Sequence, residues 1–395
     1  MTYTVPSSLT KETLPAYFDQ SDIRLDEFKA LCSQSVDLAT YPTAETVQQN
    51  IVIYQGDKLY DALLHPTAEI EIKAELIRCL KDGPGVFVIK GAYPDTAVID
   101  GMTDVFKEIV AQEKAAGGEG GDHFGQNERI WNSIQKACVL APELFVDYYG
   151  NAMLALASHA WLGPYYQITA QMNSVKPGSK AQSSHRDYHL GFQSRETTTH
   201  FPVHTQMMSQ YLTLQGAIAH GDMPLESGPT LFLPFSQQYP AGYLTFHDDD
   251  FAAYFDDHKV QIPFQKGDAV FFSPALFHGA GTNVSNSDRI ANLVQISSAF
   301  GRPMESVNRY AMIEKVYPIL LEKVKADAIS ARAIQDTIAA LADGYSFPTN
   351  LDSDPPLGGN VPVTAQQLVH QALQEYLPWP QLKQQLDHYA QRRQA

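Results

Sequence analysis

The chain has 395 residues, and its 28 Lys and Arg against 44 Asp and Glu give a formal net charge of −16 at pH 7. Because 44% of the residues are hydrophobic and 11% aromatic, the chain can bury a sizeable core, which excludes disordered, collagen-like and coiled-coil architectures. The acidic balance also disfavours duplex nucleic acid as a partner, since that affinity rests on Lys and Arg neutralising phosphates.

The spacing of the cysteines and the length of the apolar runs indicate the expected cellular location. Cys32, Cys79 and Cys138 lie far apart without a C-x-x-C spacing, so neither a disulfide framework nor a thiolate zinc site is predicted. The segment MTYTVPSSLTKETLPAYF lacks a basic stretch followed by an apolar one, and no apolar run reaches the roughly 18 residues of a membrane span. We therefore expect a cytoplasmic protein that does not cross a membrane.

From about residue 10 to 160 the pattern is mainly helical, with apolar residues spaced by three and four. These spacings occur at Ile72, Leu76, Ile77 and Leu80, and again around Met102, Val105, Phe106 and Ile109. One strand is predicted within this zone, over residues 85–89. The run AAGGEGGDHFG, residues 115–125, is too rich in glycine for either regular element, and we expect a loop that could act as a lid.

From about residue 164 to 300 the pattern changes to short runs rich in β-branched and aromatic residues, separated by Gly, Pro, Asn and Asp. The runs are YYQITAQMNSV (165–175), SQYLTLQGAIAH (209–220), GPTLFLP (228–234), DAVFFSPALFH (268–278) and RIANLVQISSAF (289–300). Many short strands within one zone predict a sandwich or a jelly-roll barrel.

Beyond about residue 304 the helical period returns, and it ends at Gly344. A Pro/Gly-rich connector, residues 348–362, then leads to two last helices and is a second candidate for a lid. We expect these C-terminal helices to pack on the barrel or to form a contact between subunits, such as a homodimer.

These patterns together predict an α+β protein with a mainly β core. The core is expected to be a double-stranded β-helix, or cupin-like jelly roll, with flanking N- and C-terminal helices. We divide the chain into an N-terminal helical extension (1–70), the jelly-roll domain with its supporting helices (71–303) and a C-terminal helical extension (304–395).

A candidate metal site lies within the β zone. His185 and Asp187 are two residues apart, and since residues i and i+2 of a strand point to the same face, their imidazole and carboxylate would converge. His278, at the end of the predicted strand 268–278, would supply a third ligand. Two histidines with one carboxylate form the facial triad of non-haem Fe(II) oxygenases, which leaves open positions on the metal.

Arg289 begins the next predicted strand after His278. A guanidinium at that place could hold the distal carboxylate of a molecule through two parallel hydrogen bonds while the other end of the molecule chelates the metal.

Two further segments have the same H-x-D form, so spacing has to decide between them. His247-Asp248-Asp249 lies too close to His278 for the strands of a jelly roll to intervene, and we interpret it as a solvated acidic loop. His220-Gly221-Asp222 is the stronger rival, although it leads directly into the turn DMPLESGP.

Four pieces of the chain carry a resemblance to a known family. In order they are LKDGPGVFVIKGAYP, SVKPGSKAQSSHRDYHLGF, GDMPLESGPTLFLPFSQ and FQKGDAVFFSPALFHGAGTNVSNSDRIANLVQIS. Over roughly residues 75–305 the chain resembles the phytanoyl-CoA dioxygenase-like family of Fe(II)/2-oxoglutarate oxygenases. The pieces are similar to the family's opening strand, its H-x-D segment, its acidic turn and the segment with its distal histidine and 2-oxoglutarate arginine.

The resemblance implies a set of roles and a reaction. It places His185, Asp187 and His278 on Fe(II) and Arg289 on the 5-carboxylate of 2-oxoglutarate, with O2 as the second cosubstrate. It implies a dioxygenase that decarboxylates 2-oxoglutarate to succinate and CO2 while it oxidises a small-molecule metabolite. Hydroxylation is the expected outcome, because halogenating relatives carry a small residue where this chain has Asp187.

The chain also departs from the family. PFSQ stands where many relatives have Pro-Gly-Ser-His, and LQGAIAHGD replaces a strand that usually contains Trp. Residues 1–70 and 305–395 resemble nothing in the family.

Further polar residues are candidates for the cofactor site. Gln171 and Asn173 share one face of the strand before His185, and Gln295 is in register with Arg289 on the later strand. We expect these three to bind 2-oxoglutarate or substrate. For Gln171 and Asn173, polar residues that face solvent are an equally consistent interpretation, and Gln295 sits near the end of its strand.

Tyr188, His189 and Phe192 follow the H-x-D pair directly, and we expect them to line the substrate side. For His189, an ordinary loop histidine is the alternative.

A different class of function stays open on the sequence alone. A metal-binding cupin-like protein or isomerase would use the same barrel without 2-oxoglutarate. It would show no dependence on 2-oxoglutarate and no effect specific to Arg289.

Overall fold

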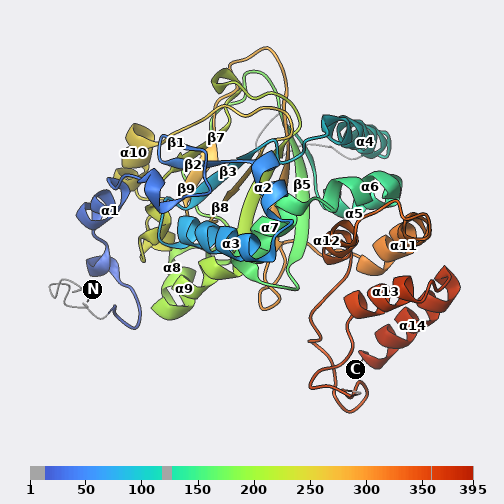
Figure 1. The fold of residues 1–395 in the computed structure, drawn as a ribbon. Helices are drawn as coiled ribbons and strands as arrows, with labels where there is room; N and C mark the ends of the chain where they lie inside the picture. The colour runs from blue at the N-terminus through green and yellow to red at the C-terminus, as the bar shows by residue number, and fades with distance from the viewer. Residues whose placement is uncertain (1–13, 118–126, 357, 395) are drawn as a thin grey trace.

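The computed structural model describes residues 14–117, 127–356 and 358–394. Its centre is a mixed sheet of eight strands (Figure 1). Neighbouring strands pair antiparallel, except β2 and β3, which are parallel. In spatial order the strands are β1 (Thr46–Gln48), β2 (Ile51–Gln55), β3 (Val86–Lys90), β8 (Ala269–Phe272), β6 (Thr213–Ala219), β10 (Arg289–Ser297), β5 (Gln167–Val175) and β4 (Glu128–Ile130).

A second, smaller sheet consists of β7 (Thr230–Leu233) and β9 (Phe277–Ala280). Single bridges extend it, one between His185 and His278 and one between Phe232 and Val260. The ring of Phe232 lies 5.1 Å from that of Phe272 on β8, so the two sheets enclose a common core. This arrangement confirms the predicted jelly-roll core.

The space between the two sheets is apolar at one end and polar at the other. Side chains alternate along each strand, so every second residue points into this space. Ile53, Val88 and Phe272 fill it under β2, β3 and β8. Farther along the sheet, β5 and β6 contribute the buried amides Gln171 and Gln215. A polar interior needs hydrogen-bond partners, which makes this end the candidate for a site.

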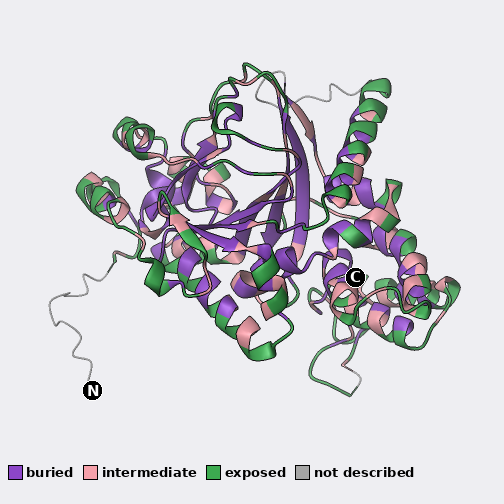
Figure 2. Cartoon of the chain, turned by 45° about the horizontal axis from the view of Figure 1, so that its top comes forward, coloured by how far each residue is buried: buried purple, intermediate pink, exposed green. Residues whose placement is uncertain are grey.

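Helices cover the opposite face of the large sheet, and Figure 2 shows the strands and the inner sides of these helices as buried. The helices that contact the strands are α2 (Gly56–Ala62), α3 (Pro66–Lys81), α4 (Thr96–Ala115), α5 (Ser133–Leu140), α7 (Ala152–Leu162) and α12 (Ala331–Leu341). Around them pack α6 (Pro142–Tyr149) and α11 (Arg309–Lys325).

The most deeply buried of these helices is α7, and its sequence explains why. The stretch AMLALASHAWL is apolar nearly all round, as expected of a helix enclosed on every side. Its start is fixed by Asn151, whose side chain accepts hydrogen bonds from the N–H groups of Met153 and Leu154 at 2.9 and 3.0 Å.

The outer face of the small sheet packs on α1 (Leu25–Cys32) and α10 (Asp249–His258), which flank β7 and β9 in Figure 1. Phe28 of α1 contacts both Phe277 of β9 and Phe251 of α10, with ring centroids 4.9 Å apart in each pair. Two short helices, α8 (Arg195–Thr199) and α9 (Val203–Ser209), lie in the long connection from the H-x-D segment to β6.

The C-terminal extension packs on the helical layer. Its α11 contacts α5 and α6, and α12 contacts α6 and α7. The connector has no regular structure among its described residues, and it leads to α13 (Ala365–Gln374) and α14 (Trp379–Arg392).

Two parts of the fold differ from the prediction. Residues 46–55 contain β1 and β2, which extend the large sheet, whereas a helical extension without strands of the sheet was predicted for residues 1–70. The run 268–278 was predicted as one strand, but it divides at Ser273 and Pro274 into β8 in the large sheet and β9 in the small one. Pro lacks an N–H for the ladder, which suits a point where the chain changes sheets.

The two candidate lids stay predictions. Residues 118–126, most of the glycine-rich run, lie outside the described part of the chain. The connector after Gly344 is described, apart from residue 357, in a single conformation.

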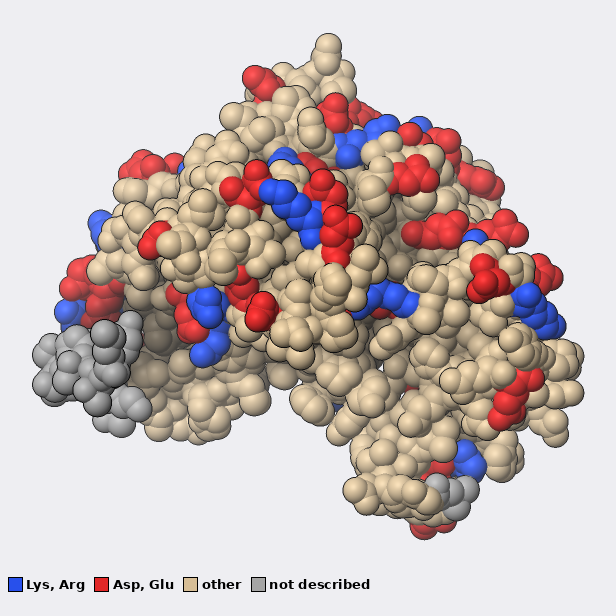
Figure 3. Space-filling model, viewed as in Figure 1, with Lys and Arg blue, Asp and Glu red and all other residues tan. Residues whose placement is uncertain are grey.

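The described helices are too short or too polar for a membrane span. The face in Figure 3 shows scattered Lys and Arg among more numerous Asp and Glu, in keeping with the net charge of −16.

Candidate metal centre

The structure brings the three predicted ligands together. The Nε2 atom of His278 lies 3.3 Å from Asp187 Oδ2, and that of His185 lies 3.8 Å from Asp187 Oδ1. One ligand atom from each residue lies within 4.8 Å of the other two. Two imidazoles and one carboxylate at these distances could hold one metal ion and leave positions free on it.

The backbone around His185 is not the strand that the sequence predicted. A single bridge holds it: His185 N donates to His278 O at 3.0 Å, and His278 N donates to His185 O at 3.2 Å. Asp187 N then donates to Pro274 O at 2.9 Å. Three hydrogen bonds therefore fix the H-x-D pair directly against the segment that carries His278.

The protonation states suit metal binding. Nδ1 of His185 donates to Ser183 O at 3.0 Å and Nδ1 of His278 donates to Leu276 O at 2.8 Å, since a carbonyl can only accept. Both Nε2 atoms are therefore left with a lone pair towards Asp187. Burial and the neighbouring His278 lower the pKa of His185, which keeps its ring neutral at pH 7.

Asp187 is held as a carboxylate. Burial by itself would raise the pKa of this carboxyl group, but the adjacent His278 and His185 rings and the hydrogen bond from Gln215 hold the pKa well below its usual range. Neutral imidazoles and an ionised carboxylate are the forms that a metal requires.

Gln215 is a site residue that the sequence did not reveal. It lies on the inner face of β6, is 8% exposed, and donates from Nε2 to Asp187 Oδ2. The run LTLQGA gives no local hint of this contact, because the partner is 28 residues away. Such a contact fixes the orientation of the metal-binding carboxylate.

Replacing Gln215 by Leu is expected to weaken Fe(II) binding by roughly 10- to 100-fold, because partners of metal ligands are typically worth that much. Gln295→Leu is the matched control: Gln295 pairs with Gln215 across β6 and β10 but bonds Gln171 instead of Asp187. Anaerobic Fe(II) titration without 2-oxoglutarate measures the affinity of both variants. Equal affinities would show that Gln215 does not support metal binding.

His220, the rival ligand, belongs to the helical side of the large sheet. Its Nδ1 and Nε2 lie 2.8 Å from Thr103 Oγ1 and the Tyr148 hydroxyl. Thr103 already donates to Ile99 O and the Tyr148 oxygen accepts from Asn292, so His220 donates to Thr103 and accepts from Tyr148. Burial lowers the pKa of His220 to about 3. Both ring nitrogens are thus occupied in a neutral, structural histidine.

His247, the other alternative, is exposed, and its ring lies tilted against that of Phe246 with ring centroids 3.9 Å apart. Asp248 and Asp249 begin α10 beside it. This agrees with the interpretation as a solvated acidic segment.

Arg289 lies on the inner face of β10 and is 8% exposed. Its Nη1 contacts Ser227 O at 3.4 Å, and among the described residues no carboxylate lies within ion-pair distance. Burial lowers its pKa to about 10, so the side chain still carries its charge at pH 7. A buried cation without a counter-charge is costly, which favours an anionic ligand here.

A cavity of about 40 Å³ adjoins Arg289 between the two sheets. Small side chains leave this space open: Ala217 and Ala219 on β6 and Ala291 on β10. Gln215, which contacts Asp187, lies two residues before Ala217 on the same face of β6, so the cavity and the triad share the inner face of the large sheet.

The three predicted amides all point into the space between the sheets. Gln171 Nε2 donates to Gln295 Oε1 at 3.1 Å, and both side chains are buried. Asn173 lines the cavity together with Arg289. The solvent-facing interpretation of Gln171 and Asn173 is therefore wrong, because both side chains are buried.

The residues after the H-x-D pair are placed differently from one another. Tyr188 is 2% exposed, and burial together with the charge of Asp187 raises its pKa. His189 is half-buried, with Nδ1 3.1 Å from Ser209 Oγ. Phe192 is 56% exposed, so of the three only Tyr188 is enclosed beside the triad.

Glu305 is a second residue that the sequence did not single out. It follows β10 in a segment without regular structure, and Asn132 N donates to its Oε1 at 2.6 Å. Burial raises the pKa of Glu305, while hydrogen bonds from Asn132 and Gln171 act in the opposite direction. The polar end of the barrel thus contains a carboxyl group beside the predicted amides.

Comparison with known proteins agrees with this geometry. The family model described as Phytanoyl-CoA dioxygenase (PhyH) matches residues 82–291, more than half of the chain and the part that contains the triad and Arg289. The chain belongs to the phytanoyl-CoA dioxygenase family. The predicted cofactors, Fe(II), 2-oxoglutarate and O2, are those of this family, and the donor set fits them. The chain is thus an enzyme of the Fe(II)/2-oxoglutarate-dependent dioxygenases.

Three individual proteins are similar to parts of this chain. Dioxygenase cdmA of Talaromyces verruculosus is 30% identical over 242 residues, which is 59% of this chain and 75% of the relative. Dioxygenase cdmD of the same organism is 31% identical over 148 residues, 36% of this chain, and the chain spans less than half of that relative's length, 43%. The solved structure of the non-heme α-ketoglutarate-dependent carbocyclase SnoK from nogalamycin biosynthesis is 21% identical. It has a TM-score of 0.43 and covers 57% of this chain and 83% of its own.

Proposed function

We propose that this member of the phytanoyl-CoA dioxygenase family hydroxylates a small-molecule metabolite, with His185, Asp187 and His278 on Fe(II) and Arg289 on the 5-carboxylate of 2-oxoglutarate. The observation that carries the proposal is the buried guanidinium of Arg289, which has no carboxylate partner among the described residues and borders a cavity in the same barrel as the three converging ligands. A dianion with carboxylates at its two ends fits a metal at one end and an arginine at the other.

The bound iron, with 2-oxoglutarate and O2, supplies the oxidising power for the reaction, in which 2-oxoglutarate is converted to succinate and CO2. The protein contributes placement. Ser183 O and Leu276 O hold the two imidazoles with their Nε2 atoms inwards, and Gln215 holds the carboxylate. Gln171, Asn173 and Gln295 line the same inner face and would donate hydrogen bonds to 2-oxoglutarate or substrate.

The substrate would approach from the polar end of the barrel, where Tyr188 and Glu305 lie. A carboxyl group and a phenol there favour a substrate with hydroxyl or other hydrogen-bonding groups over a purely apolar one. His189 and Phe192 would belong to the outer rim of that entrance, since they are half-buried and exposed. Halogenating relatives carry a small residue at the position of Asp187. Because this chain has a carboxylate ligand there, the site supports hydroxylation over halogenation.

Turnover without added substrate tests the proposal. Purified protein with Fe(II), 2-oxoglutarate and O2 is expected to release succinate slowly, and a hydroxylated metabolite should accelerate this release several-fold when it is a substrate. Omitting Fe(II) or replacing 2-oxoglutarate by 2-oxoadipate provides the controls. Metal binding without any 2-oxoglutarate-dependent oxidation would favour the cupin-like binding protein or isomerase instead.

A further inference from the structure

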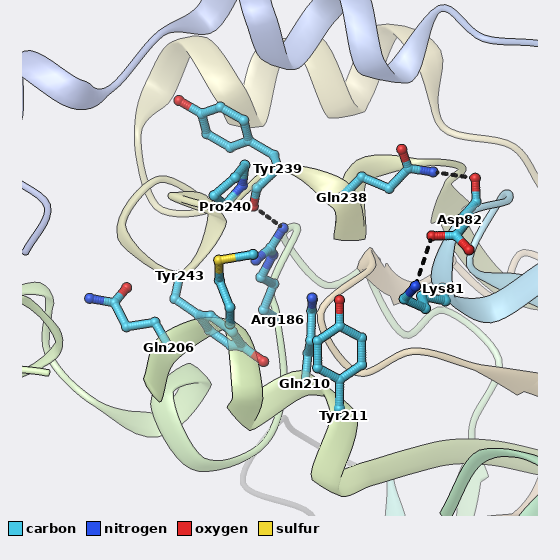
Figure 4. A pocket seen from close by; sticks show the side chains of 11 residues that line it. Lys81, Asp82, Arg186, Gln206, Gln210, Tyr211, Gln238, Tyr239, Pro240 and Tyr243 are labelled. Carbon is cyan, nitrogen blue, oxygen red and sulfur yellow. Dashed lines mark hydrogen bonds and ion pairs between the residues drawn. The ribbon is translucent and has the colours of Figure 1, made fainter. Parts of the chain in front are cut away.

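A second charged pocket lies on the other side of the H-x-D segment. Arg186 stands between His185 and Asp187 and points away from them, and it is 2% exposed. Its guanidinium borders a pocket of about 230 Å³, separate from the cavity at Arg289 (Figure 4). The pocket lies between the end of α3, α9 with the 3-10 turn after it, and residues 238–243.

The charge of Arg186 is not neutralised by the protein. Nη2 donates to Ser236 O at 2.6 Å and to Tyr239 O at 3.1 Å, and the rings of Tyr243 and Phe277 lie 5.0 and 5.3 Å away. These partners are neutral. Within the described ranges no carboxylate reaches ion-pair distance, and Nε has no hydrogen-bond partner. A buried cation in this state favours an anionic partner.

The backbone at Gly242 leaves room for the guanidinium of Arg186. A Cβ atom on Gly242 would lie 1.9 Å from the guanidinium carbon, so the absence of a side chain there is what lets Arg186 lie against this turn. The arginine is therefore fixed at the pocket wall and does not need to reorganise when a ligand binds.

The rest of the pocket suits an anion as well. Lys81, Gln210 and Tyr211 surround the same space as Arg186 in Figure 4 and offer an ammonium group, an amide and a hydroxyl. The single carboxylate in the lining, Asp82, is already paired with Lys81 at 3.5 Å. Gln238 caps the carbonyls of Asp82 and Gly83 at 2.9 Å each, which removes two competing acceptors.

We propose that this pocket binds a small molecule through an oxyanion, a phosphate or a carboxylate, with Arg186 as the main contact. The site is distinct from the 2-oxoglutarate site, because Arg186 and Arg289 line different cavities. The pocket is larger than one oxyanion, so the ligand would carry a polar body that Gln210, Gln238 and Tyr211 contact.

Thermal unfolding of the full-length apoprotein in sodium phosphate, sodium acetate and sodium chloride at equal ionic strength tests the proposal. Phosphate or acetate at saturating concentration is expected to raise Tm by about 2–4 °C over chloride. Whichever of the two gives the larger shift identifies the class of oxyanion.

Three variants localise the effect. Arg186→Met should abolish the shift, and Gln210→Glu should do so without removing the buried arginine, because it adds a negative charge beside it. Gln210→Glu thus keeps the test valid if Arg186→Met does not fold. Arg289→Met should retain the shift. Equal Tm values in all three salts, or a shift that survives in Gln210→Glu and disappears in Arg289→Met, would overturn the proposal.

Discussion

Replacing His278 by Ala is expected to reduce Fe(II) binding and 2-oxoglutarate turnover by more than about 100-fold. Removing a residue that only hydrogen-bonds to a metal ligand typically costs up to about 100-fold, and removing a ligand itself should cost more. The reason is that His278 supplies one of three ligand atoms and its Nε2 lies 3.3 Å from Asp187 Oδ2. Its main-chain bridge to His185 does not depend on the side chain, so the protein should still fold. Anaerobic Fe(II) titration and succinate release measure the two effects.

His220→Asn is the matched control, since both histidines are 4% exposed in the same barrel. Losing the bonds of His220 to Thr103 and Tyr148 is expected to cost about 2 kcal/mol of stability and to leave Fe(II) affinity unchanged. If His220→Asn abolished metal binding while His278→Ala retained it, the choice of ligands would be wrong.

Arg289→Met is expected to raise the KM for 2-oxoglutarate by about 100-fold or more, since truncating one member of a buried charge pair costs about 2–5 kcal/mol. Fe(II) affinity without 2-oxoglutarate should not change, because Arg289 is not one of the three residues that supply ligand atoms. Arg289→Lys should be intermediate, as it keeps the charge and loses the two-pronged geometry. Initial rates over a range of 2-oxoglutarate concentrations give the comparison.

Arg309→Met controls for the removal of a buried arginine. Arg309 lies on the helical side, where it donates to Ala340 O at 2.6 Å and to Ile168 O at 2.7 Å. This variant should lose stability and keep the wild-type KM for 2-oxoglutarate. A similar KM in Arg289→Met and the wild type would contradict the assignment of the cosubstrate site.

The parts of the fold that follow from local patterns could be predicted from the sequence. The strand pattern of residues 165–175 and 289–300 predicted β5 and β10, which pair along their whole length. The β1–β2 pair was missed because the strands are only three and five residues long, too short for a clear alternation in the sequence. The division of residues 268–278 was missed because two strands in different sheets follow one another almost without a break.

The predicted metal ligands come together for a reason other than the predicted one. His185 and Asp187 were expected to share the face of a strand, whereas one bridge and the hydrogen bond to Pro274 O place them. The contact of Gln215 with Asp187 joins residues far apart in the chain, and no local pattern encodes it. The same holds for Arg186, whose isolation becomes visible only when its neighbours are known.

The most direct test of the account is anaerobic addition of Fe(II) and then 2-oxoglutarate to the wild-type apoprotein, followed by visible absorption. We expect one Fe(II) per chain and a weak charge-transfer band that develops with 2-oxoglutarate, as chelation beside the triad requires. Stoichiometric Fe(II) binding with no band at any 2-oxoglutarate concentration would contradict the proposed role of Arg289 and favour a metal-binding barrel that does not use 2-oxoglutarate.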